Sequence, residues 1–288
     1  MIPPDVFPSY AQYHEDIILA ALFKGKKDGF YVDVGANYEE YHSVTKYFYE
    51  RGWRGINIEP IPRLIKTFNK KRPRDINLNY AVAAKKGTLS FREYPNHDGY
   101  STFSEETKKE NEKLGLPHID YDVKVDSLKN IFTRYKLTEI DFLKIDVEGF
   151  ENEVLHSNDW KIFRPKVICI EANHRDEDWS KFIISQKYTC IIFDGLNEYY
   201  IDNESMVIFD NFAERATILA HNGIRNHLLN QWREDINHIV ELTNMIEQKD
   251  KTIRTLQHTQ QTLDMNMQNI KFLLKQLKKQ IILRLRVK

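Results

Sequence analysis

Short apolar runs alternate with amphipathic segments over residues 12–201 of the chain. The runs have the length of single strands, and the segments between them carry apolar residues at the three- and four-residue spacing of helices, beginning with 12–24. The predicted strands lie at 30–35, 55–60, 78–82, 88–91, 140–146, 166–171, 188–193 and 198–201, the last two as a hairpin. This alternation predicts an α/β fold, a parallel sheet with helices on both faces.

In the C-terminal part of the chain, the apolar residues have a different spacing. Apolar residues recur there as the a and d positions of a seven-residue repeat, and eleven of the fourteen seam positions are apolar. The a positions are Ile239, Ile246, Ile253, Gln260, Met267, Leu274 and Ile281, and the d positions are Leu242, Lys249, Leu256, Leu263, Ile270, Leu277 and Arg284. This pattern predicts an α-helical coiled coil that makes the protein a homo-oligomer, either a dimer or a trimer. A single helix packed on the domain is the alternative, although it needs a broader apolar stripe.

Length and charge fit two parts. A chain of 288 residues with 41% hydrophobic content can form one large domain, 1–220, and an appendage, 221–288. The whole chain has 42 basic and 42 acidic residues, which gives no sign of nucleic-acid binding. Twelve of the basic and six of the acidic residues follow from His221 onward. The basic C-terminal end suits a peripheral contact with an anionic membrane or an acidic partner, and solvated flanks of a coiled coil explain it as well.

The N-terminus has no basic region followed by an apolar stretch, and no window approaches the roughly twenty apolar residues of a membrane span. We therefore expect a cytoplasmic protein, with membrane contact restricted to its periphery. The two cysteines, Cys169 and Cys190, lie in apolar strand-like runs, and both are expected to be buried. A disulfide framework is excluded by their number.

The first two predicted strands end in residues that suit a nucleoside. Asp33 and Gly35 end the first strand and Glu59 ends the second, where an acid can accept the hydrogens of both ribose hydroxyls. A dinucleotide needs several glycines, whereas here only Gly35 is present and two acids, 39–40, follow it. An acidic site favours S-adenosylmethionine, which carries a sulfonium cation and no phosphate. The alternative is that these acids are only turn or cap residues.

Five blocks of sequence resemble the FkbM family of S-adenosylmethionine-dependent methyltransferases. They lie, in order, at 11–17, 31–37, 42–45, 52–60 and 142–151, and the resemblance covers about residues 9–202. It implies a Rossmann-like class I methyltransferase sheet and methylation of a hydroxyl group, with a sugar of a bacterial polysaccharide or glycolipid as the leading acceptor. Many members have a further glycine where this chain has 38–40, which leaves the contacts of the methionine moiety open.

The resemblance also implies roles for single residues, block by block. It implies that Asp33, Gly35 and Asn37 line the cofactor site and that Glu59 binds the ribose. It places Ala81 and Val82 near the adenine, and His42 and Ser43 near the methionine end. For His42, a hydrogen-bonding role in an ordered turn is equally supported.

The strand at 140–146 carries the candidate catalytic residues. Asp146 ends this strand, and alternation places Glu148 on the same side if the strand continues, so that one carboxylate can take the acceptor proton. Glu148 as a helix cap, with Asp146 only holding the cofactor amine, is the alternative. His174 and Glu171 are further candidates for the base. These four residues could also converge on a hard cation, but their spacing is not that of a tight metal motif, and we expect no metal.

Residues 92–122 form a polar insertion in which Tyr94, His97, Tyr100 and Phe103 stand among charges. Aromatic faces stack on sugars, so the insertion is interpreted either as an acceptor-binding lid or as a solvated loop, and Trp179 raises the same question. Two other functions stay open beside a sugar O-methyltransferase. One is a nicotinamide-dependent oxidoreductase, which the missing glycines disfavour. The other is an inactive scaffold oligomerised by its coiled coil, which the intact acidic blocks disfavour.

Overall fold

The computed structural model of this chain describes residues 9–95, 97–172, 179–210, 212, 249, 251–253, 267, 275 and 278. The chain divides into two units, Met1–His227 and Leu228–Lys288, and each is considered by itself. The described residues of the second unit are helical and exposed, including the seam residues Lys249, Ile253 and Met267. The pairing of such helices, the basic C-terminal end and the expected domain boundary near 220 lie outside the described residues and stay predictions.

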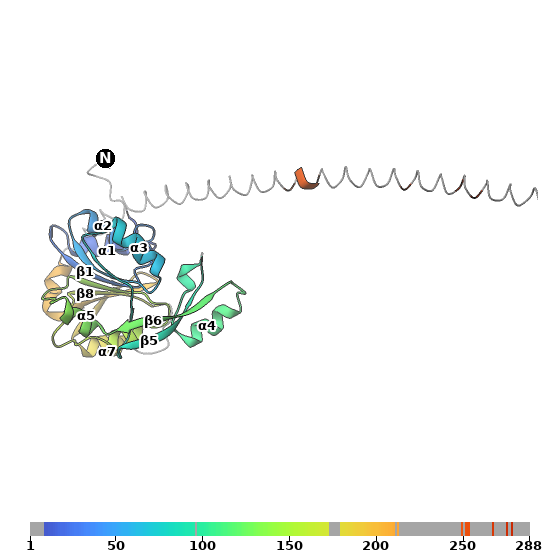
Figure 1. The fold of residues 1–288 in the computed structure, drawn as a ribbon. Coiled ribbons are helices and arrows are strands. Elements are labelled where there is room, and N and C mark those ends of the chain that lie inside the picture. Colours follow the sequence, from blue (N-terminus) through green and yellow to red (C-terminus); the bar gives the residue numbers. More distant parts are fainter. Residues whose placement is uncertain are drawn as a thin grey trace, which may run out of the picture. The chain divides into compact units, whose positions relative to one another are not determined.

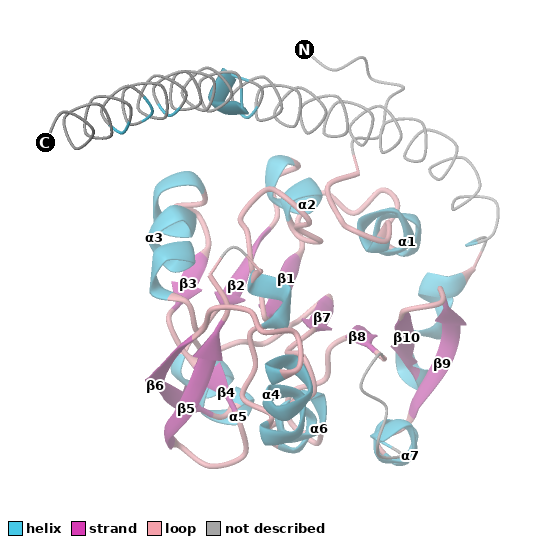
Figure 2. Cartoon of the chain, turned by 90° about the vertical axis from the view of Figure 1, so that its right-hand side faces the viewer, coloured by secondary structure: helices cyan, strands magenta, loops and turns pink. Residues whose placement is uncertain are grey.

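A 7-stranded sheet forms the centre of the first unit, in the order β3-β2-β1-β7-β8-β10-β9. The strands are β1 (Phe30–Val34), β2 (Arg54–Ile58), β3 (Ile76–Leu78), β7 (Phe142–Ile145), β8 (Val167–Glu171), β9 (Tyr188–Phe193) and β10 (Asn197–Asp202). Neighbours from β3 to β8 run parallel, and β10 pairs antiparallel with both β8 and β9. Figure 2 views this sheet with its strands in sequence from β3 to β9. The predicted α/β fold with a mostly parallel sheet is confirmed.

Helices cover both faces of the sheet (Figure 1). They are α1 (Glu15–Leu22), α2 (Lys46–Glu50), α3 (Pro62–Lys71), α5 (Leu128–Arg134), α6 (Glu151–His156) and α7 (Trp179–Ser185), with 3₁₀ helices at Asp98–Tyr100 and Asn203–Phe209. Tyr31 and Phe142 point to the face that α1 and α2 cover, whereas Val32 and Leu143 point to the face of α5, α6 and α7. The strict alternation along each strand therefore divides the apolar residues between two cores.

Residues 83–127, here called the arm, extend from the large sheet (Figure 1). The arm is built on a 3-stranded sheet in the order β4-β6-β5. Its strands are β4 (Ala81–Val82), β5 (Gly87–Glu93) and β6 (Ile119–Asp126), and the helix α4 (Glu105–Glu112) lies between β5 and β6 in the chain. The sequence prediction of one strand over 78–82 is wrong. Leu78 pairs with Ile58 in the large sheet, whereas Ala81 pairs with Val125 in the small one.

Three further expectations are corrected. The first helix is shorter than 12–24, because the buried carboxylate of Asp16 accepts the amides of Tyr10 and Ala11 and holds the preceding residues in an extended turn. Cys190 is exposed, because it lies on the edge strand β9, whereas Cys169 is buried. Trp179, the first residue of α7, is buried in the core, so its ring is not available to stack on an acceptor.

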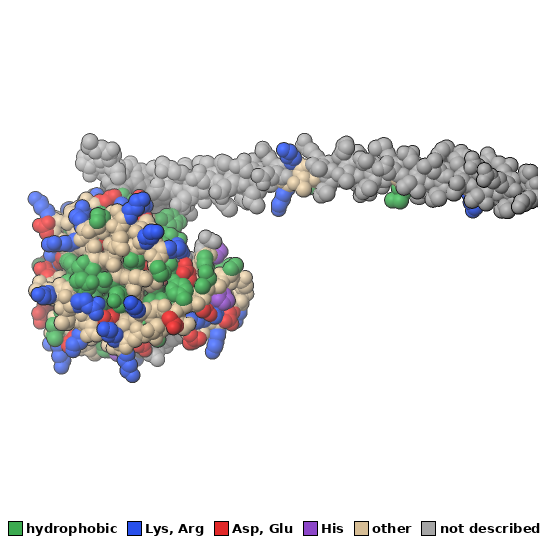
Figure 3. Space-filling view, in the orientation of Figure 1, with side chains coloured by type: hydrophobic (Ala, Val, Ile, Leu, Met, Phe, Trp, Pro, Cys, Tyr) green, Lys and Arg blue, Asp and Glu red, His purple; other side chains and the backbone are tan. Residues whose placement is uncertain are grey.

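The surface of the first unit is charged without a dominant sign. Lys and Arg side chains are interspersed with Asp and Glu on the face shown in Figure 3. Residues 1–220 contain 30 basic and 36 acidic residues, so both signs are well represented in this part of the chain. Within the described ranges, no helix is both long and apolar enough to cross a membrane.

Candidate active site

A cavity of about 800 Å³, its open mouth included, lies beyond the carboxyl ends of β1, β2, β7 and β8. This edge of a parallel sheet is where ligands bind in open α/β folds. Its lining includes Gln12, Gly35, Asn37, Glu59, Tyr80, Ala81, Val82, Phe91, Gly99, Ser101, Phe103, Asp146, Glu148 and Glu171. No Lys, Arg or His is among the described residues that line it.

The turn after β1 is built for close approach. Gly35 has φ +77°, and a Cβ at this position would lie 1.7 Å from the carbonyl oxygen of Asp146. The amides of Gly35 and Ala36 donate to the carbonyl oxygen of Ile58, at 3.0 and 3.2 Å. Only glycine fits this turn, which leaves the space above it to a ligand.

Glu59 joins the turn after β1 to the start of α3. Its Oε2 accepts the amide of Asn37 at 2.9 Å, and its Oε1 accepts the amide of Ile61 at 2.9 Å. Asn37 has φ +50°, and its Oδ1 is buried with no hydrogen-bond partner among the described residues. Since each carboxylate oxygen can accept more than one hydrogen bond, Glu59 on the cavity wall can still bind ribose hydroxyls.

Asp33 and Ser43 do not line the cavity in the described part of the chain. Asp33 is buried; its Oδ2 accepts the hydroxyl of Thr45 at 3.1 Å, and its Oδ1 lies 3.6 Å from Nζ of Lys144. Burial raises the pKa of Asp33, and the charges of Lys144 and Arg72 oppose that shift. Both residues therefore support the wall from behind, and their contact with a cofactor stays a prediction.

Arg72, at the end of α3, is the centre of this support. Its guanidinium is fully buried, forms an ion pair with Asp75 at 3.0 Å, and donates to the hydroxyls of Tyr31, Ser43 and Thr45 at 2.7, 3.2 and 2.8 Å. A charge this deep requires such partners. The network fixes the loop between β1 and α2, and thereby Asp33.

The β3 side of the cavity is largely apolar. Ala81 and Val82 line it there together with Tyr80 and Phe91. A flat aromatic base gains from burial between such side chains. The positions for which the resemblance implies adenine binding thus lie on the apolar part of the wall.

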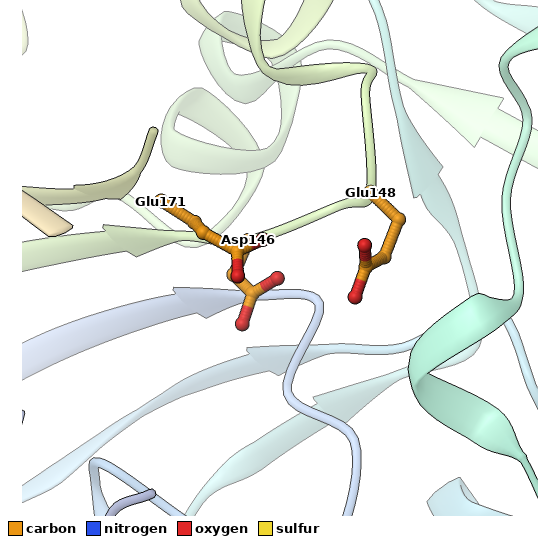
Figure 4. Close-up of side chains that lie close together, drawn as sticks. All are labelled: Asp146, Glu148 and Glu171. Atoms are coloured by element: carbon orange, nitrogen blue, oxygen red, sulfur yellow. The ribbon is translucent and has the colours of Figure 1, made fainter. Parts of the chain in front are cut away.

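Three carboxylates converge at the opposite part of the cavity (Figure 4). Asp146 follows β7, Glu148 lies in the next loop and Glu171 ends β8, with ligand oxygens that all lie within 4.8 Å of one another. The strand does not continue to Glu148, because β7 ends at Ile145 and Glu148 has φ +54°. The turn, rather than strand alternation, brings Glu148 to Asp146.

Charge repulsion within this cluster is reduced in two ways. Burial, and then the charges of Asp146 and Glu148, raise the pKa of Glu171 far above its usual range, so Glu171 holds a proton at neutral pH. In addition, Nζ of Lys144 lies 3.1 Å from Oδ2 of Asp146. Three carboxylates could also hold a hard divalent cation, and the expectation that none is needed stays a prediction. His174 lies outside the described residues.

Lys144 is a residue that the sequence analysis did not select. It alternates with apolar residues in β7 and thus has the pattern of an ordinary solvated strand position, yet it is buried. Its ammonium donates to the carbonyl oxygen of Gly35 at 3.1 Å and faces both Asp33 and Asp146. Burial lowers the pKa of Lys144, but the charges of Asp146 and Asp33 outweigh it and the net shift is upward. Lys144 therefore stays charged and ties the β1 turn to the carboxylate cluster.

The loop that carries Glu148 is held from both sides. The buried carboxylate of Glu151 accepts the amides of Val147 and Gly149, at 3.1 and 3.2 Å. The N-cap of α6 is Phe150, so Glu148 does not have the helix-cap role that was its alternative. From the arm, the hydroxyl of Thr102 donates to the carbonyl oxygen of Glu148 at 2.7 Å.

The arm is part of the cavity wall. Gly99, Ser101 and Phe103 line the cavity, and a Cβ at Gly99 would lie 3.8 Å from Oε1 of Glu148. Phe103 packs against Phe91 and Phe150, with ring centroids 4.5 and 5.8 Å apart. This placement favours the interpretation of residues 92–122 as an acceptor-binding element over their interpretation as a solvated loop.

Comparison with protein families agrees with this geometry. The model of the methyltransferase FkbM domain matches residues 33–224, which include the turn after β1, Glu59, the arm and the carboxylate cluster. A comparison with curated proteins finds no match. The family match covers most of the chain and confirms the resemblance to this family, although the first of the five sequence blocks, 11–17, lies before the matched residues. The chain belongs to the FkbM methyltransferase family.

Proposed function

We propose that the protein is an S-adenosylmethionine-dependent O-methyltransferase that acts on a sugar hydroxyl, in a bacterial polysaccharide or glycolipid. The observation that carries the proposal is one cavity in which the Gly35 turn and Glu59 lie at one part of the wall and a carboxylate cluster faces the arm at another. When bound, S-adenosylmethionine supplies an electrophilic methyl group on a sulfonium cation. A lining with acids and without Lys, Arg or His among its described residues suits that cation.

The residues of the chain have two tasks in the reaction. The turn at Gly35, Glu59 and the Ala81–Val82 strand hold the nucleoside, while the cavity aligns the acceptor oxygen. Glu148 takes the proton of the acceptor hydroxyl, since it lies in the cavity at the junction with the arm. Asp146, paired with Lys144, orients the positive end of the cofactor. His174 is the alternative base, and Glu171 can take this role only once its own proton has left.

Acceptor binding is assigned to the arm. Phe103 offers an aromatic face in the cavity and Ser101 lies next to it in the lining, a combination that suits the C–H face and the hydroxyls of a sugar. Tyr100 is 45% exposed and Tyr94 is fully buried, so only the former is accessible to an acceptor that extends out of the cavity.

Binding and transfer test the proposal separately. Calorimetry is expected to show binding of S-adenosylhomocysteine, and Glu59→Ala is expected to weaken it by about 1–3 kcal/mol through lost hydrogen bonds. Transfer of a labelled methyl group to a lipid-linked or nucleotide-linked glycan of the host tests the acceptor class. Tight NADH binding without a response to S-adenosylhomocysteine would contradict the methyltransferase proposal.

A further inference from the structure

The residues before α1 contribute to the cavity through Gln12, an exposed residue that is part of its lining. We propose that Gln12 binds the α-carboxylate of the methionine moiety of the cofactor. The inference rests on the proposed function and assigns a residue to the end of the cofactor for which the sequence left the contacts open.

The backbone around Gln12 is fixed on both sides. Before it, the buried carboxylate of Asp16 accepts the amides of Tyr10 and Ala11, at 2.7 and 3.3 Å, and Ala11 forms a short parallel bridge with His42. After it, the amide of Tyr13 donates to Oε2 of Glu15 at 2.9 Å. The backbone of Gln12 is thus held in place before any ligand enters, which lowers the entropic cost of a contact.

Gln12 lies away from the apolar part of the cavity. Glu15, three residues later, accepts a hydrogen bond from Nδ2 of Asn197 at 3.3 Å, and Asn197 pairs with Glu171 across β10 and β8. Ala81 and Val82 follow β3, on the other side of β1 and β7. A cofactor with its base near Ala81 and its ribose on Glu59 therefore extends its amino-acid part over β1 and β7 toward Gln12.

Few hydrogen-bond donors are available to a carboxylate in the part of the cavity near Gln12. The amides of Gly35, Ala36 and Asn37 already donate to Ile58 and Glu59. Asp146 suits the α-ammonium group, and no Lys, Arg or His is among the described lining residues. The primary amide of Gln12 supplies two N–H donors without a charge, so it can bind a carboxylate and does not compete with the α-ammonium group for the acids.

The test compares S-adenosylhomocysteine with 5′-methylthioadenosine, which keeps the adenosine and the thioether but lacks the amino-acid part. In the full-length chain, Gln12→Ala is expected to raise the Kd of S-adenosylhomocysteine at least about tenfold and to leave the Kd of methylthioadenosine unchanged. Gln12→Glu is expected to weaken S-adenosylhomocysteine further, because a carboxylate repels a carboxylate. Tyr13→Ala is the control, since that exposed neighbour does not line the cavity.

Two results would overturn the assignment of Gln12. One is an unchanged Kd of S-adenosylhomocysteine in Gln12→Ala, and the other is an equal loss for both ligands. Failure of the proposed function gives a different pattern, in which the wild-type chain binds neither ligand, and the inference then fails with it.

Discussion

Glu148 has a backbone conformation that few side chains adopt, and the chain holds it there with Glu151 and Thr102. Such strain is retained where the position of a group matters. We expect Glu148→Gln to lower turnover at least about a hundredfold, because the amide cannot accept the hydroxyl proton, and to leave the affinity for S-adenosylhomocysteine nearly unchanged. Single-turnover methyl transfer and calorimetry measure the two quantities.

Asp146→Asn is the companion variant. It also lowers turnover at least about a hundredfold, but it changes cofactor binding as well, because Asp146 pairs with Lys144 beneath the positive end of the cofactor. If Glu148→Gln retained wild-type turnover, Glu148 would be excluded as the base, and Glu171 and His174 would be next to test.

Glu15 gives the first unit a pH dependence of its own. It is 6% exposed, and burial raises its pKa from the ordinary 4.5 to about 7. The folded chain therefore holds this proton more tightly than the unfolded chain, and stability falls as the pH rises from about 4.5 to about 7. When the pH is raised from about 5 to about 8, the unfolding free energy of Glu15→Gln should increase by about 1–3 kcal/mol relative to that of the wild type.

Thermal or urea unfolding at the two pH values measures this difference. Asp16, whose pKa burial also raises, to about 6, is present in both chains, and its charge contributes to the raised pKa of Glu15, so the measured difference belongs to the pair. Parallel stability curves for the two chains would show that Glu15 does not titrate in this range.

The sequence predicted the acids of the site better than the residues that hold them. Asp146 and Glu148 follow an apolar run, and Glu171 ends another, so their strand positions mark them. Lys144 and Arg72 gave no such signal, because a charged residue at alternate strand positions or at a helix end is usually solvated. Their burial follows from partners distant in sequence, which a local pattern does not contain.

At the scale of elements, the large sheet was largely predictable, whereas in the arm only β5 was predicted, as the strand at 88–91. Buried parallel strands such as β1, β7 and β8 are continuous apolar runs. In β6, by contrast, acids and lysine alternate with valines, because only one face of the small sheet is covered. The alternation from Ile119 to Asp126 is a strand signal of period two that the surrounding charges obscured.

The arm and the base are connected by one hydroxyl, which gives a prediction for the element. Thr102→Val removes the bond to the carbonyl oxygen of Glu148 while it keeps the shape of the side chain. Turnover is expected to fall about tenfold, and the Kd of S-adenosylhomocysteine to change less than about twofold.

Thr133→Val is the matched control, because the Thr133 hydroxyl also donates to a backbone carbonyl at 2.7 Å, but on the exposed side of α5. Equal turnover of the Thr102 and Thr133 variants would mean that the arm does not position Glu148.

For the whole molecule, the two units should be separable. A chain truncated after His227 keeps the large sheet with both of its cores, and it is expected to fold and to bind S-adenosylhomocysteine like the full chain. It should also be a monomer, because the seven-residue repeat lies beyond the truncation point. Light scattering of both chains measures this, and the same number of chains per particle in both would contradict the predicted coiled coil.

The two ends of the arm lie next to each other, since Val82 and Asp126 are partners in the pairing of β4 with β6. The gene thus encodes in one uninterrupted stretch the part of the cavity wall to which our proposal assigns acceptor binding, whereas Gly35, Glu59 and Asp146 are encoded outside it. Recombination or insertion within that stretch can give the enzyme a new acceptor while the methyl-donor site is inherited unchanged. Related enzymes that modify different glycans are accordingly expected to diverge most in length and sequence between these two positions.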